Sequence, residues 1–140
     1  MNSENEKCVV IVDGEQPIGI IANTAAILGI TMGKSKPDIV GSDVTDSEGC
    51  SHMGIIRFPV PVLKGDREVL KAIRARLSEP KYAELTAVDF SDLAQRCKTY
   101  DEFTHNMAGA SGNELNYIGI AVCGSSKLVS KLTGNLPLLR

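Results

Sequence analysis

The stretch Lys7–Gly33, KCVVIVDGEQPIGIIANTAAILGITMG, decides the fold of this chain. Within it, Cys8–Val12 is an unbroken apolar run rich in Val and Ile, which is typical of a strand buried on both faces. A turn sequence ending in a proline suited to a helix start follows. Ile18–Ile30 then has few polar residues and no alternation, which predicts a helix buried against the sheet, with Gly29 and Gly33 as candidate stops.

Two apolar segments are expected at the centre of the sheet and one at its edge. Cys8–Val12 and Asn116–Cys123 are continuously apolar, as central strands are. Phe58–Leu63 contains Pro59 and Pro61, which cannot donate to a strand ladder and whose alternate spacing places both missing N–H groups on one side. We therefore expect Phe58–Leu63 to lie at an edge of the sheet.

Strands and helices alternate along the chain, which indicates one α/β domain over residues 1–140. The remaining elements expected are a strand at 84–90 and helices at 66–78, from 91, at 99–107 and at 127–133. Residues 1–6 are expected to fray. The polar segment 34–52 is interpreted as a long loop, and the apolar tail 136–139 is expected to pack down.

Composition restricts the functions that fit this chain. Its 140 residues carry a net charge of −2 and only 4% are aromatic, which argues against non-specific nucleic-acid binding and against a base-stacking platform. The N-terminus lacks the apolar core of a signal peptide, and no run is expected to span a bilayer. The four cysteines are scattered, which fits reduced thiols in a cytoplasmic protein better than disulfides or a zinc site. We expect no metal and no cofactor.

Two polar residues, Asn23 and Thr24, interrupt the apolar helix near its start. They either face a pocket at the first turns of the helix or hydrogen-bond to the local backbone. The first interpretation has support because a buried amide needs a hydrogen-bonding partner. The sequence leaves both interpretations open.

Three further residues have functional groups in suggestive places. Asp89 ends a predicted strand, where α/β folds often place a site, although a capping role for the next helix is the alternative. Cys50 and His52 lie two apart in the long loop, as a nucleophile and base or two metal ligands would, although solvated side chains are the alternative there.

The two ends of the chain resemble a known family. Gly124–Leu139, GSSKLVSKLTGNLPLL, resembles the closing helix and tail of type II peptidyl-tRNA hydrolases, which finish in Lys-[Val/Leu]-Thr-Gly-x-Leu-x-Leu-Leu. Lys7–Ala26 looks like their first strand and the helix that carries an Ala-Ala pair. The run Pro-x-Gly-x-x-x-Asn-x-Ala-Ala from Pro17 and the Leu-Leu-Arg ending are similar to a related uncharacterised group, the "domain of unknown function two thousand" family, over nearly the whole chain.

This resemblance implies a three-layer α/β/α domain with a mixed sheet of four to five strands. Dimers are common in the superfamily, and together with the apolar tail this makes a homodimer the expected assembly. Asp89 and Gln95 are the positions that resemble an Asp and a nearby Gln of the hydrolases. Gly19 resembles their first-turn glycine, but the essential lysine that follows it there is replaced here by Ile20.

Three functions remain open from the sequence, and whether the protein is an enzyme is open with them. The first is a small-molecule-binding or regulatory module, the second a hydrolase of an acyl ester such as peptidyl-tRNA with Asp89 as a catalytic residue, and the third a dimeric interaction protein. For the first, we expect convergence of side chains from the ends of two strands and from the long loop: Gly19, Asn23, Thr24, Cys50, His52, Asp89 and Gln95.

We predict that the protein does not hydrolyse peptidyl-tRNA efficiently. The reaction needs an oriented cation near the scissile ester, and no lysine occurs between Lys7 and Lys34. Removing one such group typically costs ~10²–10³ in rate. The measurement is cleavage of N-acyl-aminoacyl-tRNA beside a true type II enzyme. Turnover within about tenfold of that enzyme, abolished by Asp89→Ala, would contradict the prediction.

Overall fold

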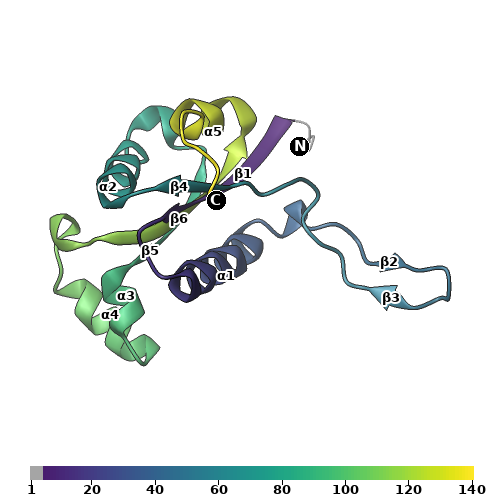
Figure 1. The fold of residues 1–140 in the computed structure, drawn as a ribbon, viewed down its shortest axis with the longest axis horizontal. Helices are drawn as coiled ribbons and strands as arrows, with labels where there is room; N and C mark the ends of the chain where they lie inside the picture. The colour runs from purple at the N-terminus through teal and green to yellow at the C-terminus, as the bar shows by residue number, and fades with distance from the viewer. Residues whose placement is uncertain (1–4) are drawn as a thin grey trace.

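A computed structural model describes residues 5–140, which form an α/β domain around a mixed four-stranded sheet (Figure 1). The strand order is β4-β1-β6-β5, and a separate hairpin pairs β2 with β3. The strands are β1 Glu6–Asp13, β2 Val44–Thr45, β3 Ser51–His52, β4 Val62–Gly65, β5 Thr86–Ser91 and β6 Tyr117–Ser125. The α-helices are α1 Ile18–Ser35, α2 Arg67–Arg76, α3 Asp92–Arg96, α4 Tyr100–Ala108 and α5 Ser126–Thr133.

The two strands predicted to be central are central. β1 pairs with β6 in antiparallel register, from Glu6 opposite Ser125 to Val12 opposite Gly119. β4 runs parallel to β1, and β5 runs antiparallel to β6. Both central strands are buried along almost their whole length, because helices cover both faces of the sheet. Glu6, expected to fray, instead begins β1; the expectation for residues 1–4 lies outside the described residues.

The edge strand differs from the prediction in extent and in pairing. β4 covers only Val62–Gly65, so the prolines precede the strand, and the Pro61 carbonyl accepts a hydrogen bond from Val10 N–H at 3.0 Å. β4 is the last strand on its side of the sheet, as expected. The C-terminal tail nevertheless pairs with its outer side, where Leu139 N–H donates to the Val62 carbonyl at 2.8 Å. The tail therefore packs down by covering an edge, which protects it from other chains.

α1 is longer and more exposed than predicted. It continues through both predicted glycine stops to Ser35, because neither glycine is followed by a residue that ends a helix. Only Thr24, Leu28 and Met32 are buried, and they pack on one face of the sheet. By length and composition α1 could span a membrane, with a mean hydropathy of 1.3, which the sequence expectation had not allowed. Its buried residues belong to the core, so spanning a bilayer would require α1 to leave the sheet.

The opposite face of the sheet is covered by α2 and α5 (Figure 1). The helix predicted at 66–78 is present as α2, with Leu70 and Ile73 buried and Asp66 accepting a hydrogen bond from Val69 N–H at the start of the helix. Ser91 caps α3 and Thr99 caps α4 in the same way. These caps join side-chain oxygens to backbone N–H groups three residues ahead.

The predicted loop 34–52 contains structure of its own. A 3₁₀ turn at Pro37–Ile39 leads into a two-stranded ribbon that projects from the domain (Figure 1). We call residues 39–57 the arm. Its base is held by a hydrogen bond from Arg57 N–H to the Ile39 carbonyl at 2.9 Å, and its tip turns at Gly49, where φ is 85°. Nearly all the side chains of the arm are exposed.

We predict that Gly119→Ala destabilises the fold by about 1–3 kcal/mol, as overpacking of a core does. A Cβ on Gly119 would lie 2.5 Å from Thr24 Cγ2 and 3.1 Å from Leu28 Cδ1, so α1 would have to move off β6. Urea unfolding measures the effect. The matched control is Gly19→Ala, where a Cβ meets nothing within 4 Å and helix propensity favours the change. Equal free energies of unfolding for the two variants would contradict this packing.

Candidate functional site

Three strands end at the same edge of the sheet. β1, β4 and β5 run in one direction because β1 is parallel to β4 and both β1 and β5 are antiparallel to β6. At this edge β5 ends in Ser91, and β6 begins at Tyr117. Polar side chains gathered at the carboxyl ends of such strands are the usual place for a site in α/β folds.

An ion pair joins the end of β5 to α2. Arg74 Nε donates to Asp89 Oδ2 at 3.1 Å, and both side chains are about one-third exposed. Tyr117 lies beside this pair, since both charges act on its hydroxyl. Burial raises the pKa of Tyr117, the Asp89 charge raises it further, and the Arg74 charge opposes the shift. Tyr117 therefore stays protonated at neutral pH and can donate a hydrogen bond.

A basic cavity lies between α2 and the segment before β6. Its volume is about 280 Å³. Its polar lining comes from Lys71, Arg74, Ser78, Asn113 and Tyr117. Lys71 Nζ donates to the Asn113 carbonyl at 2.7 Å, which holds the ammonium group at the rim. The cavity thus combines the Lys71 ammonium group and the guanidinium of Arg74, which is paired with Asp89, with hydroxyl groups in a lining that is otherwise largely apolar. Cations and hydroxyl groups together can bind a carboxylate or a phosphate.

A second cavity lies on the α1 side of β5. Its volume is about 480 Å³, and its lining is mainly apolar. Ile27 and Thr31 of α1 form one wall, and Tyr100 and Phe103 of α4 form the other. We call this cavity the α1–α4 groove. Asp89 and Lys98 also line it, and its aliphatic and aromatic walls are suited to the side chains of a protein partner.

The structure does not bring the predicted site residues together. Asn23 is exposed on α1, whereas Asp89 forms its ion pair with α2 on the other side of the sheet. Thr24 is buried and donates to the Ile20 carbonyl at 2.7 Å, so the backbone alternative holds for this residue. The predicted convergence of Asn23, Thr24 and Asp89 is therefore wrong. Residues near the ends of two strands of one sheet can still lie on opposite faces of that sheet.

The remaining predicted residues are also apart. Cys50 and His52 lie at the tip of the arm, where His52 Nε2 is 2.8 Å from Asp46 Oδ2. The His52 contact and two backbone N–H groups hold the pKa of Asp46 below its ordinary value. Gln95 is exposed on α3 and Gly19 is exposed at the start of α1. Within residues 5–140, no three His, Cys, Asp or Glu side chains gather as a metal site requires.

Sequence reasoning missed Arg74, Lys71 and Tyr117. Lys71 and Arg74 lie off the apolar face of the helix predicted at 66–78. Their i,i+3 spacing places both on one stripe of α2, and Ser78 follows just after the helix ends at Arg76. A polar stripe on a helix is usually solvated. Only the approach of β6 and Asn113 turns this stripe into one wall of a cavity.

The chain matches the family described as protein of unknown function (DUF2000) over residues 6–140. Its fold is similar to the solved structure of the protein of unknown function Atu0240 from Agrobacterium tumefaciens strain C58, with a TM-score of 0.84 and 19% sequence identity. The match covers 96% of this chain and 97% of that one. No curated protein matches the chain. At this identity the likeness concerns the fold alone.

We predict that Asp92 stabilises the site edge at neutral pH and not in acid. Burial raises the pKa of Asp92, but hydrogen bonds from Asn116 and Leu93 and the Arg96 charge outweigh it, so the pKa lies below its ordinary 3.8. A lowered pKa means that the contribution is present above 3.8 and is lost as pH falls through the folded-state value.

The measurement is urea unfolding of the wild type and Asp92→Asn at neutral pH and in acid. At neutral pH we expect the variant to be less stable by about 1 kcal/mol, because the carboxylate is partly exposed and its hydrogen bonds are correspondingly weak. In acid the difference should shrink, since the wild-type carboxyl is then protonated. A difference that stays constant with pH would contradict this assignment.

Proposed function

The chain belongs to the DUF2000 family of proteins of unknown function, and we propose that it binds a small anionic molecule in the basic cavity beside Asp89. The observation that carries this proposal is the convergence of Lys71, Arg74 and Tyr117 on one cavity at the sheet edge. The net charge of the chain is −2, so two cations beside one cavity differ from the average charge of the protein.

Asp89 orients the arginine rather than contacting the ligand. It accepts only from Nε of Arg74, which leaves the terminal guanidinium nitrogens available to a bound group. A planar guanidinium held in this way can bind a carboxylate or phosphate with two parallel hydrogen bonds. Asp89 is thus a positioning residue in this proposal.

The cavity limits the size and chemistry of the ligand. About 280 Å³ lies at the low end of small-molecule pockets, so a metabolite with one acidic group fits better than a nucleotide or a tRNA end. Lys71 and Arg74 neutralise the acid, and Ser78 and Tyr117 supply hydroxyl groups for its polar substituents. The class proposed is therefore a small carboxylate or phosphate monoester.

A relation to type II peptidyl-tRNA hydrolases forms part of this proposal. Asp89 resembles the aspartate of those enzymes, and the residues that follow Gly19 lack their lysine. The engagement of Asp89 with Arg74 supports a binding role over ester hydrolysis, because the carboxylate is already paired with a cation. In this proposal the protein is a binding or regulatory module, and its Asp89 occupies the position of the aspartate in the related enzymes.

We predict that small carboxylates or phosphate monoesters raise the melting temperature of the wild type. The measurement is a thermal-shift screen with a panel of these compounds, in which saturation at 100 times the dissociation constant would add about 2.7 kcal/mol. Arg74→Gln should abolish the shift, because the oriented guanidinium is lost. Arg67→Gln, an exposed arginine on the same helix, should retain it.

Two results would overturn the proposal. One is a panel in which no compound stabilises the wild type. The other is a stabilising compound that acts equally on Arg74→Gln, which would place its site elsewhere. Repeating the screen at high salt separates specific binding from diffuse attraction, since exposed charge pairs are screened while partly enclosed ones are screened much less.

A further inference from the structure

We propose that the protein forms a two-fold homodimer by exchanging arms, with the arm of each copy lying in the α1–α4 groove of the other. Beyond its base, where Ile39 is buried in the core, the arm projects away from its own domain (Figure 1). Its strands pair only with each other, through Val44 opposite His52 and Thr45 opposite Ser51. An isolated two-stranded hairpin is marginal in water, so a surface that packs against the arm is needed.

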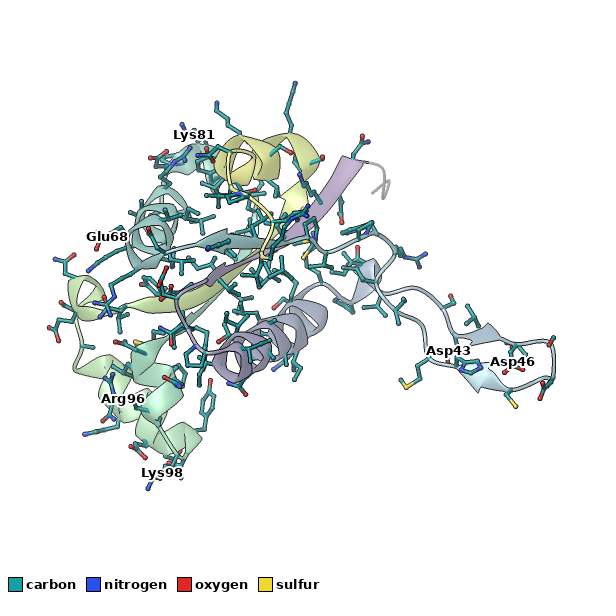
Figure 2. All side chains as sticks on the ribbon, viewed as in Figure 1. Asp43, Asp46, Glu68, Lys81, Arg96 and Lys98 are labelled. Carbon is teal, nitrogen blue, oxygen red and sulfur yellow. The ribbon has the colours of Figure 1, made fainter. Side chains whose placement is uncertain are left out.

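The arm presents apolar side chains to solvent. Met53 is 85% exposed, Ile55 79% and Val44 60%. Their exposure comes from the geometry of the ribbon, which projects beyond the layers of the domain (Figure 2). Three large apolar residues on one short projecting segment exceed the scattered apolar residues of ordinary surfaces and indicate an interaction site.

The α1–α4 groove offers a matching surface. Tyr100 is 78% exposed, and its ring meets Phe103 edge-on with centroids 5.5 Å apart. Ile27 and Thr31 form the facing wall. A cavity of about 480 Å³ is large enough for two or three aliphatic side chains such as those of the arm. Aromatic residues in the wall of a groove are typical anchors of protein interfaces.

The relative positions of the arm and the groove favour a second copy as the occupant. The arm projects from one end of the molecule, whereas α3 and α4 lie at the other end (Figures 1 and 2). A chain cannot place its own arm in its own groove in this arrangement. A two-fold axis beside α1 carries each arm toward the other copy's α3 and α4 and closes the assembly.

The exposed face of α1 fits such an axis. Only 17% of the helix is buried, and Ile18 and Ile30 are 86% and 74% exposed. Gly19, Ala22 and Ala26 lie on the exposed side and have small side chains that permit close approach of a second helix. In this arrangement the two α1 helices pack antiparallel across the axis, and the arms extend past them in opposite directions.

The arm is acidic, and one cation lines the groove. The arm carries Asp43, Asp46 and Glu48, and Lys98 lines the groove together with Asp89, whose charge is balanced by its ion pair with Arg74 (Figure 2). The contact along α1 is longer than the arm strands, because α1 has 18 residues and is ~27 Å long, whereas β2 and β3 have two residues each and are ~7 Å long.

The first test is the molar mass of the full chain by light scattering at micromolar concentration. We expect twice the mass of one chain for the wild type. Met53→Asp should raise the dimer dissociation constant by on the order of tenfold or more, since a charge would enter an apolar groove. Leu138→Asp, an exposed apolar residue outside this surface, should stay dimeric. A monomeric wild type, or a Met53→Asp variant that dimerises unchanged, would overturn the proposal.

The second test uses the protein's own cysteines. Cys50 is at the arm tip and Cys97 lines the groove, whereas Cys8 and Cys123 are buried. A short bismaleimide should link Cys50 of one copy to Cys97 of the other, and either Cys50→Ser or Cys97→Ser should abolish the linked dimer. A product that survives Cys97→Ser would join two arm tips and overturn the exchange. Monomers that bind phosphatidylglycerol vesicles would overturn it too and assign α1 to a lipid surface.

Discussion

The antiparallel pairing of β1 with β6 is the constraint on which the rest of the structure depends. It runs from Glu6 opposite Ser125 to Val12 opposite Gly119 and buries both strands between two layers of helices. Gly119 sets the distance at one end of the pairing, because Thr24 and Leu28 of α1 occupy the space that a side chain would fill. The packing distance between α1 and the sheet is therefore fixed at Gly119, and a shift in the register of β6 would place a larger side chain against α1.

That pairing also determines where polar chemistry can occur. Since β1, β4 and β5 run together, their carboxyl ends share an edge. The tail closes the outer side of β4 through Leu138, which leaves the β5 side of the sheet as the accessible one. Both cavities discussed above border this side, the basic cavity toward α2 and the α1–α4 groove toward α1. The proposed ligand site and the proposed dimer contact thus lie on opposite faces of one strand.

The two faces of β5 differ because the pleat sends successive side chains to opposite layers. Asp89 points toward α2 and forms an ion pair with Arg74, whereas Phe90 packs in the core beneath α1. The charged face is suited to binding an acid, because Asp89 orients the guanidinium of Arg74 through Nε and leaves its terminal nitrogens available as donors. The apolar face is suited to protein contact. A single alternation in the sequence therefore separates the two proposed sites in space.

Elements with local causes could be predicted from the sequence. The apolar runs became central strands, and Asp66, Ser91 and Thr99 cap their helices as side chains that reach only three residues ahead. Helix ends were less predictable: α1 passes Gly29, because glycine weakens a helix without ending it.

The site, the arm and the exposure of α1 depend on long-range packing and could not be predicted from local sequence. Arg74 meets Asp89 because a helix crosses a strand that is fifteen residues away in sequence, and no local pattern encodes that approach. Asn23 and Asp89 were expected together because both follow strands, but the sheet separates them. The physical reason is that periodicity fixes which side chains share one element's face, while the layer that each face meets depends on long-range packing.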